Sequence, residues 1–121
     1  MKASVIMSTY NAVQWLEKVV WGFSVQTVTD FEIIIADDGS DAKTKEKIDE
    51  LRKLIVVPII HIWHEDHGFQ KTKILNKAIL ASTTDYLIFI KESKNFIILI
   101  SAKMELFVFK HKSSIKKKSR I

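Results

Sequence analysis

The chain has 121 residues, the usual size of one domain, and 47% of them are hydrophobic, so it can bury a core and does not have the composition of a disordered chain. It contains no cysteine, which excludes a disulfide framework, thiol catalysis and cysteine-based zinc sites, and no run reaches the roughly 18 apolar residues that a membrane span needs. The net charge of +5 is unevenly distributed, because residues 1–90 carry 10 basic against 12 acidic side chains and residues 91–121 carry 9 against 2, so a nucleic-acid-binding face within residues 1–90 is not indicated.

Strand and helix signals alternate through residues 1–90, beginning with the apolar run 3–8, which predicts a strand. Asn11 and Gln14 follow at the spacing of a capping box, which predicts the start of a helix. The next apolar side chains recur at i, i+3, i+4 and i+7, as in an amphipathic helix: Leu16, Val19, Val20 and Phe23.

The continuous apolar run 31–36 predicts a strand that is covered on both faces. It leads directly into two adjacent carboxylates, Asp37 and Asp38, which repel each other and lose solvation if they are buried. We therefore expect hydrogen-bond donors or positive charge to meet them. Ser40 or Asp41 can cap the following helix, whose apolar side chains lie at turn spacing: Ile48, Leu51 and Ile55.

Residues 59–64 and 85–90 predict two further strands, and a third helix lies between them. The alternating order predicts an α/β fold, a Rossmann-like parallel sheet of about four strands with flanking helices. Ligands of such sheets bind beyond the carboxyl ends of the strands. Polar clusters follow the first three strands, so we expect them to converge on one crevice: residues 8–11, 37–40 and 64–69.

Three histidines, His61, His64 and His67, recur at three-residue spacing and suggest a metal triplet. On a strand, however, residues i and i+3 point to opposite faces, so we do not expect one zinc site.

Phosphate-binding loops of the common kinds are absent from the sequence. The only glycines are Gly22, Gly39 and Gly68, so the chain has neither G-x-G-x-x-G nor a Walker motif. An aromatic ring and carboxylates suit a nucleobase and ribose better, because Tyr10 can stack on a base and a carboxylate can accept from a base N–H or a ribose hydroxyl. The sequence therefore predicts a nucleoside-binding crevice.

Four stretches match one known family in order and spacing: residues 4–27, 30–40, 64–79 and 85–90. Together they resemble the amino-terminal half of family 2 glycosyltransferases of GT-A fold, over about residues 3–90. Within that family the chain is most similar to bacterial enzymes that build surface polysaccharide, in which an E-D-x-G-F stretch precedes the third helix. The resemblance implies a hexosyltransferase-type activity on a nucleotide-diphosphate sugar, most often UDP-linked.

The resemblance also implies roles for individual residues. Ser8, Tyr10 and Asn11 would lie in the nucleotide pocket, with Tyr10 against the base. Asp38 would accept from the N–H of the base, usually uracil, with Asp37 beside it. Two residues of the third helix would face the nucleotide or ribose, and four would form the wall near the sugar: Lys73 and Asn76, then Glu65, Asp66, Gly68 and Phe69.

The chain departs from the family where the fourth strand should lead into an Asp-x-Asp motif that holds Mn²⁺ or Mg²⁺ on the diphosphate. It has Lys91, Glu92 and Ser93 there, so we predict no metal ligand and no catalytic residue. Charge and pattern change at the same point, so we interpret the chain as truncated or frame-shifted after about residue 90. A divergent but genuine short protein is the alternative. In either case we expect no sugar transfer by this chain alone.

We therefore divide the chain into a partial GT-A nucleotide-sugar-binding domain, residues 1–90, and a divergent, irregular basic segment, residues 91–121. That segment contains two apolar runs with the composition of strands, and residues 110–120 form a basic tail that we expect to be solvated. Half of a domain would leave an unpaired sheet edge, so self-association is expected.

Two other classes remain open on the sequence alone. A receiver-like signalling domain also has paired aspartates beside a parallel sheet, but there the pair follows the first strand. A small nucleic-acid-binding protein would act through the basic tail, which includes residues 116–118. No signal peptide is visible, so we expect a cytoplasmic protein, with peripheral association at the inner membrane face as an option.

Overall fold

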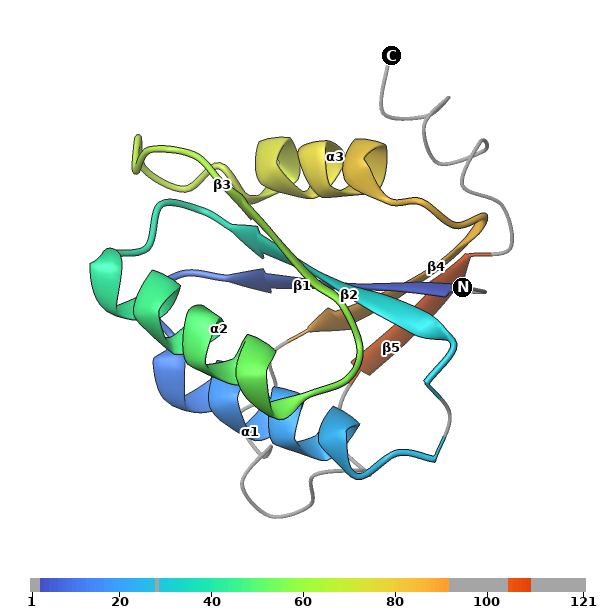
Figure 1. Cartoon of the computed structure of the whole chain (residues 1–121). Coiled ribbons are helices and arrows are strands. Elements are labelled where there is room, and N and C mark those ends of the chain that lie inside the picture. Colours follow the sequence, from blue (N-terminus) through green and yellow to red (C-terminus); the bar gives the residue numbers. More distant parts are fainter. Residues whose placement is uncertain (1–2, 28, 92–104, 110–121) are drawn as a thin grey trace.

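The computed structural model describes residues 3–27, 29–91 and 105–109, in which strands and helices alternate up to the fourth strand (Figure 1). This alternation confirms the predicted order. The elements are, in chain order, β1 (Ala3–Thr9), α1 (Val13–Ser24), β2 (Phe31–Asp37), α2 (Ala42–Leu54), β3 (Ile59–Trp63), α3 (Lys71–Ala81), β4 (Tyr86–Lys91) and β5 (Glu105–Phe109).

The strands form one sheet in the order β3-β2-β1-β4-β5. β1 to β4 are parallel, which confirms the predicted Rossmann-like fold. β5 pairs antiparallel with β4, from Leu87 opposite Phe109 to Lys91 opposite Glu105. The sheet therefore has one strand more than the four predicted, and five residues of the segment expected to be irregular form regular structure.

The sheet lies between two helical layers, with α1 and α2 on one face and α3 on the other (Figure 1). Every residue of β2 is buried, because alternate side chains enter the two cores. Ile33 and Ile35 pack with α1 and α2, whereas Ile34 and Ala36 pack with α3. This double coverage explains the continuous apolar sequence of the strand.

The predicted capping box of Asn11 and Gln14 is wrong. Ala12 is the N-cap of α1, and no side chain caps that end. Asn11 has a φ of 46°, which asparagine tolerates better than most residues, and its side chain accepts a hydrogen bond from the backbone N–H of Asp41 at 2.9 Å. Its own N–H donates to Ser40 Oγ at 2.9 Å, so Asn11 joins the β1–α1 connection to the β2–α2 connection. Asp41 is the N-cap of α2, one of the two candidates from the sequence.

A buried carboxylate holds together the ends of β1 and β2 that lie away from these connections. Glu32 is only 1% exposed, and it accepts hydrogen bonds from Ser4 Oγ at 2.7 Å and from the N–H and Oγ1 of Thr83 at 2.9 and 2.7 Å. Because a carboxylate is costly to bury without donors, these contacts link the starts of β1 and β2 to the residues before β4.

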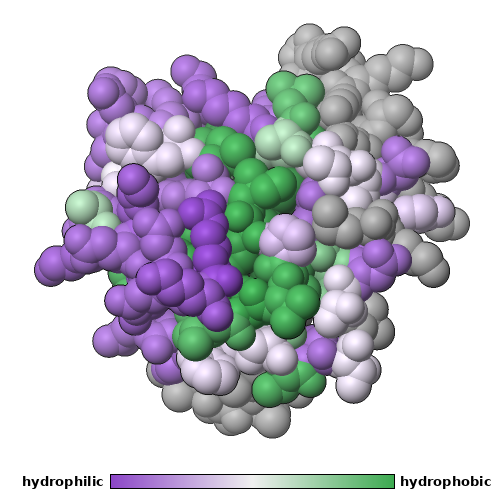
Figure 2. All heavy atoms as spheres, in the orientation of Figure 1, coloured by the Kyte–Doolittle hydropathy of each residue, from purple (hydrophilic) through white to green (hydrophobic). Residues whose placement is uncertain are grey.

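The two edges of the sheet differ. The edge of β4 is paired with β5, whereas β3, within the described part of the chain, pairs only with β2. Figure 2 shows apolar side chains gathered at the middle of the face that β3 crosses in Figure 1. Val56, just before β3, is 90% exposed. Self-association at this edge stays a prediction.

No helix of the described ranges has the length and apolar character needed to cross a bilayer.

Replacing a core leucine of α1 tests the packing of the helices against the sheet. Leu16 is fully buried, so Leu16→Ala should lower the free energy of unfolding by about 2–5 kcal/mol. Leu54, at the end of α2, is 59% exposed, and Leu54→Ala should cost less than about 1 kcal/mol. Urea unfolding followed by circular dichroism measures both variants, and equal losses would contradict the described core.

Candidate functional site

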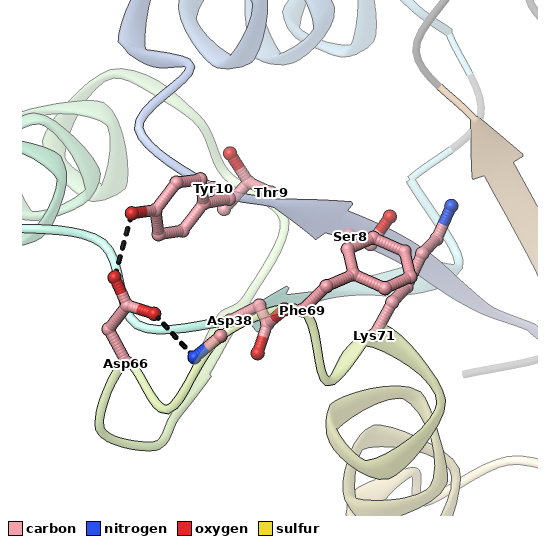
Figure 3. A pocket seen from close by; sticks show the side chains of 8 residues that line it. Ser8, Thr9, Tyr10, Asp38, Asp66, Phe69 and Lys71 are labelled. Atoms are coloured by element: carbon pink, nitrogen blue, oxygen red, sulfur yellow. Dashed lines mark hydrogen bonds between the residues drawn. The ribbon is translucent and has the colours of Figure 1, made fainter.

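A cavity of about 460 Å³ lies where β1 and β2 end and the β3–α3 loop (residues 64–70) crosses them. It is therefore at the carboxyl edge of the parallel strands, where the sequence predicts a crevice. Figure 3 shows the side chains that line it, which come from the ends of β1 and β2, from the loop and from the start of α3. The lining residues are Ser8, Thr9, Tyr10, Asp38, Asp66, Gly68, Phe69 and Lys71.

Six of the eleven site residues predicted from the sequence line this cavity: Ser8, Tyr10, Asp38, Asp66, Gly68 and Phe69. Sequence reasoning missed Thr9 and Lys71. Thr9 lies between two predicted residues, and Lys71 is the first residue of α3, directly after the loop. Thr9 belongs to the predicted cluster 8–11 and could have been included, whereas Lys71 lies beyond the predicted cluster 64–69.

The other five predicted residues do not line the cavity. Asn11 accepts a hydrogen bond from the β2–α2 connection, and Asp37 is buried. Glu65 and Lys73 are exposed, and Asn76 is half-buried on α3. The nucleotide and sugar contacts expected of these five residues stay predictions.

Both carboxylate oxygens of Asp37 contact other groups of the protein. It is 1% exposed, its Oδ1 accepts from the N–H of Ser40 at 2.8 Å, and its Oδ2 lies 2.8 Å from Nε2 of His61. The first bond closes the turn around Gly39, and the second ties that turn to β3. Asp37 therefore shapes the edge of the sheet rather than facing the cavity.

Asp38 lines the cavity and also holds the β3–α3 loop. Its Oδ1 lies 2.5 Å from Nε2 of His64, and its Oδ2 accepts from the N–H of Gln70 at 2.9 Å. Since His64 begins the loop and Gln70 ends it, one carboxylate fixes both ends. The partners expected for the two aspartates are thus present, and they are two backbone N–H groups and two histidines.

The three histidines do not converge on one point. His61 and His64 pair with different aspartates, and the exposed His67 lies 3.4 Å from the carboxylate of Glu65. In the part of the chain that the structure describes, no three side chains of His, Cys, Asp or Glu are grouped so that they could hold a metal ion. β3 ends at Trp63, so only His61 lies on the strand, and the strand geometry used in the prediction does not apply to His64 and His67.

Tyr10 and Asp66, which both line the cavity, are joined by a hydrogen bond (Figure 3) in which the phenol donates to Asp66 Oδ2 at 2.7 Å. The hydrogen bond and the negative charge of Asp66 favour the neutral phenol, so the pKa of Tyr10 is raised above its usual 10.0. The same bond, with a second one from the N–H of Gly68, lowers the pKa of Asp66. The ring of Tyr10 remains half-exposed and offers a flat apolar face.

The β3–α3 loop packs directly against the backbone at Gly39. Its φ of 94° is one that side-chain-bearing residues rarely adopt, and a Cβ there would lie 2.5 Å from Cα of Asp66. The backbone of Asp66 therefore needs a glycine beneath it. Gly68 has a similar φ of 84°, but a Cβ there would meet nothing within 4 Å.

A model of the family described as Glycosyl transferase family 2 matches residues 4–91. An uncharacterized glycosyltransferase from Nostoc is 35% identical over 68 residues, which are 56% of this chain and 21% of that protein. The chondroitin synthase of Escherichia coli is 29% identical over 84 residues, which are 69% of this chain and 12% of the synthase. The chain thus spans only a small part of these relatives.

Solved structures show the same fold. S. aureus TarS 1–349 in complex with UDP has a TM-score of 0.63 and 24% identity, over 75% of this chain and 27% of that one. Glucosyl-3-phosphoglycerate synthase from Mycobacterium tuberculosis, in a complex with Mn²⁺ and UDP, has a TM-score of 0.56 and 20% identity, over 74% and 33% of the two chains. These similarities confirm the partial GT-A fold expected from the sequence.

A pair of glycine variants isolates the contact between the β2–α2 turn and the loop. Gly39→Ala and Gly68→Ala both introduce a side chain at positive φ, but only the first meets a backbone. Gly39→Ala should therefore reduce the free energy of unfolding by about 1–3 kcal/mol more than Gly68→Ala does. Urea unfolding measures the difference, and equal effects would show that the loop does not rest on Gly39.

The hydrogen bond between Tyr10 and Asp66 can be tested through the ionisation of the phenol. The chain has two tyrosines, so a Tyr86→Phe background leaves Tyr10 as the only reporter. Asp66→Asn removes the negative acceptor, and the pKa of Tyr10 should fall toward 10.0. Tyrosinate absorbance followed against pH measures it, with Glu65→Gln as the neighbouring control that should leave the pKa unchanged. An unaltered pKa in Asp66→Asn would rule out the bond.

Proposed function

This chain belongs to glycosyl transferase family 2, and we propose that its cavity binds the nucleoside diphosphate of a sugar donor, in particular UDP. The observation that carries the proposal is that Tyr10 and Asp38, from the ends of β1 and β2, line one cavity. They bring an exposed aromatic face and a carboxylate acceptor to the same space, which are the two groups that a nucleobase needs.

In this proposal the base lies against the ring of Tyr10 and its ring N–H donates to Asp38. The hydroxyls of Ser8 and Thr9 are available to the ribose or to the edge of the base, because both residues line the cavity. Asp66, Gly68 and Phe69 line the cavity on the side of the loop, where the family resemblance implies that the sugar lies.

Lys71 supplies positive charge to the diphosphate. It lines the cavity and is the first residue of α3, and the amino end of a helix itself favours negative charge. Both the ammonium group and this end of the helix attract phosphate oxygens, and the described lining has no other cation.

The preference for UDP is supported by the bound nucleotides of proteins with this fold. TarS has been solved with UDP, and glucosyl-3-phosphoglycerate synthase with UDP and Mn²⁺. At identities of 24% and 20% these structures establish the fold of the chain, and the nucleotide is our proposal.

The divalent metal of the family does not fit the residues of this chain. Such an ion supplies Lewis-acid neutralisation of the departing diphosphate. β4 ends at Lys91, where the family resemblance places the first carboxylate ligand, and an ammonium group has no lone pair to give. Glu92 and Ser93 follow in the sequence and lie outside the described residues. We therefore propose that this chain binds nucleotide without the ion and transfers no sugar by itself.

The biological setting is part of the same proposal. The similarity to chondroitin synthase and the motif shared with surface-polysaccharide enzymes support a role connected with bacterial polysaccharide synthesis. The absence of cysteine fits the reducing cytoplasm, where we place the chain, with contact to the inner membrane face as the alternative. The receiver-like alternative is not supported, because the family match covers residues 4–91. The basic tail lies outside the described residues.

Titration of UDP into the full chain, with and without Mn²⁺, tests the proposal. We expect binding that changes by less than about twofold on addition of Mn²⁺, because the chain has Lys91 where the family resemblance places the first metal ligand. Tyr10→Ala should weaken binding by about tenfold through loss of stacking, whereas Trp21→Ala, on an exposed face of α1, should not.

Two outcomes would contradict this function. Mn²⁺-enhanced binding would show that the chain retains an ion site. Release of sugar from UDP-glucose or UDP-N-acetylglucosamine by the purified chain would show that transfer does not need the Asp-x-Asp pair.

A further inference from the structure

We propose that His64 is a positioning residue that fixes the carboxylate of Asp38, and that this fixed orientation makes the cavity select nucleobases with a ring N–H. The inference rests on the proposed nucleotide-binding function and adds to it the residue that sets base preference. Uracil carries such an N–H, whereas cytosine presents a ring nitrogen acceptor at the same position.

The geometry restrains the carboxylate of Asp38 at both oxygens. His64 Nε2 lies 2.5 Å from Oδ1, and the N–H of Gln70 lies 2.9 Å from Oδ2. The side chains of Asp38 and His64 are only 9% and 11% exposed, so water competes weakly for these bonds. Rotation of the carboxylate about its Cβ–Cγ bond would break both contacts.

The hydrogen bonds also decide which kind of group Asp38 can receive. An ionised carboxylate only accepts, so His64 must present Nε2–H to it. A carboxylate has about four lone-pair sites, and two of those on Asp38 are occupied by His64 and Gln70. The lone-pair sites that remain on Asp38 are fixed in direction, and Asp38 lines the cavity. The ring N–H of a base can donate to one of these sites. The ring acceptor of cytosine instead brings its own lone pair against the carboxylate, and the two repel each other.

Cytosine has an amino group next to this ring acceptor, and a carboxylate that is free to turn could accept from it. Selectivity therefore depends on the restraint and not only on the presence of Asp38. Of its two anchors, Gln70 uses its backbone, so a side-chain substitution leaves that bond in place. His64 is the anchor that substitution can remove.

The other histidines provide matched controls. His61 makes the same kind of contact with Asp37, at 2.8 Å and with the same 11% side-chain exposure, but Asp37 does not line the cavity. His61→Ala therefore tests the general effect of removing a buried histidine from this edge of the sheet. His67 is exposed and lies near Glu65 only at 3.4 Å, so His67→Ala tests a histidine of the loop itself.

The experiment compares UMP and CMP, which have no diphosphate, by calorimetric titration into the full chain without metal. The wild-type chain should bind UMP about 10- to 100-fold more tightly than CMP, because CMP leaves the fixed acceptor unpaired. His64→Ala should reduce this ratio at least about fivefold, with CMP binding unchanged or improved. His64→Gln, whose amide reaches as far as Nε2, should keep most of the ratio, and His61→Ala and His67→Ala should keep it fully.

Circular dichroism of each variant separates folding from selectivity. If His64→Ala does not fold, His64→Asn replaces it, because its amide is too short to reach Asp38, and it should show the same loss of ratio. A folded His64 variant with the wild-type ratio would overturn the positioning role, as would an equal loss of ratio in His61→Ala. If the wild-type chain binds none of UMP, CMP and UDP, the proposed function itself fails, which is a distinct result.

Discussion

Two adjacent carboxylates are buried at the end of β2, and the surrounding structure is arranged to give each of them hydrogen-bond donors. Asp37 and Asp38 are 1% and 7% exposed, and together they accept from two backbone N–H groups and contact two histidines. Without those partners their burial would cost several kcal/mol. These hydrogen bonds connect β2 to β3, close the turn at Gly39 and attach the β3–α3 loop beside the cavity.

The neighbouring aspartates have different roles because Asp37 is the last residue of β2 and Asp38 is the first residue of the turn that follows. Asp37 turns toward His61 and the buried side of the turn, whereas Asp38 lies at the cavity and holds the loop through His64 and Gln70. The loop in turn reaches Tyr10 through Asp66. The elements that would contact a nucleotide are therefore connected by hydrogen bonds before any ligand arrives, which lowers the ordering cost of binding.

In the proposed function, nucleotide recognition is separate from sugar transfer. The residues proposed to bind the nucleoside come from β1, β2 and the β3–α3 loop, all within the region that matches the family. The family resemblance places the metal-binding carboxylates at the end of β4, where this chain has Lys91. Because the two proposed sets belong to different strands, loss of the metal ligands would leave the hydrogen bonds around the cavity intact.

The sequence by itself determined the order of strands and helices, the parallel sheet and the edge at which the cavity lies, because these follow from local apolar periodicity and from chain connectivity. It also placed Tyr10 and Asp38 at that edge. Only the tertiary structure decided that Asn11 bridges two connections instead of capping α1, that two histidines serve different aspartates, and that β5 joins the sheet. These contacts join residues that are distant along the chain, and no local pattern encodes which donor reaches which acceptor across the fold.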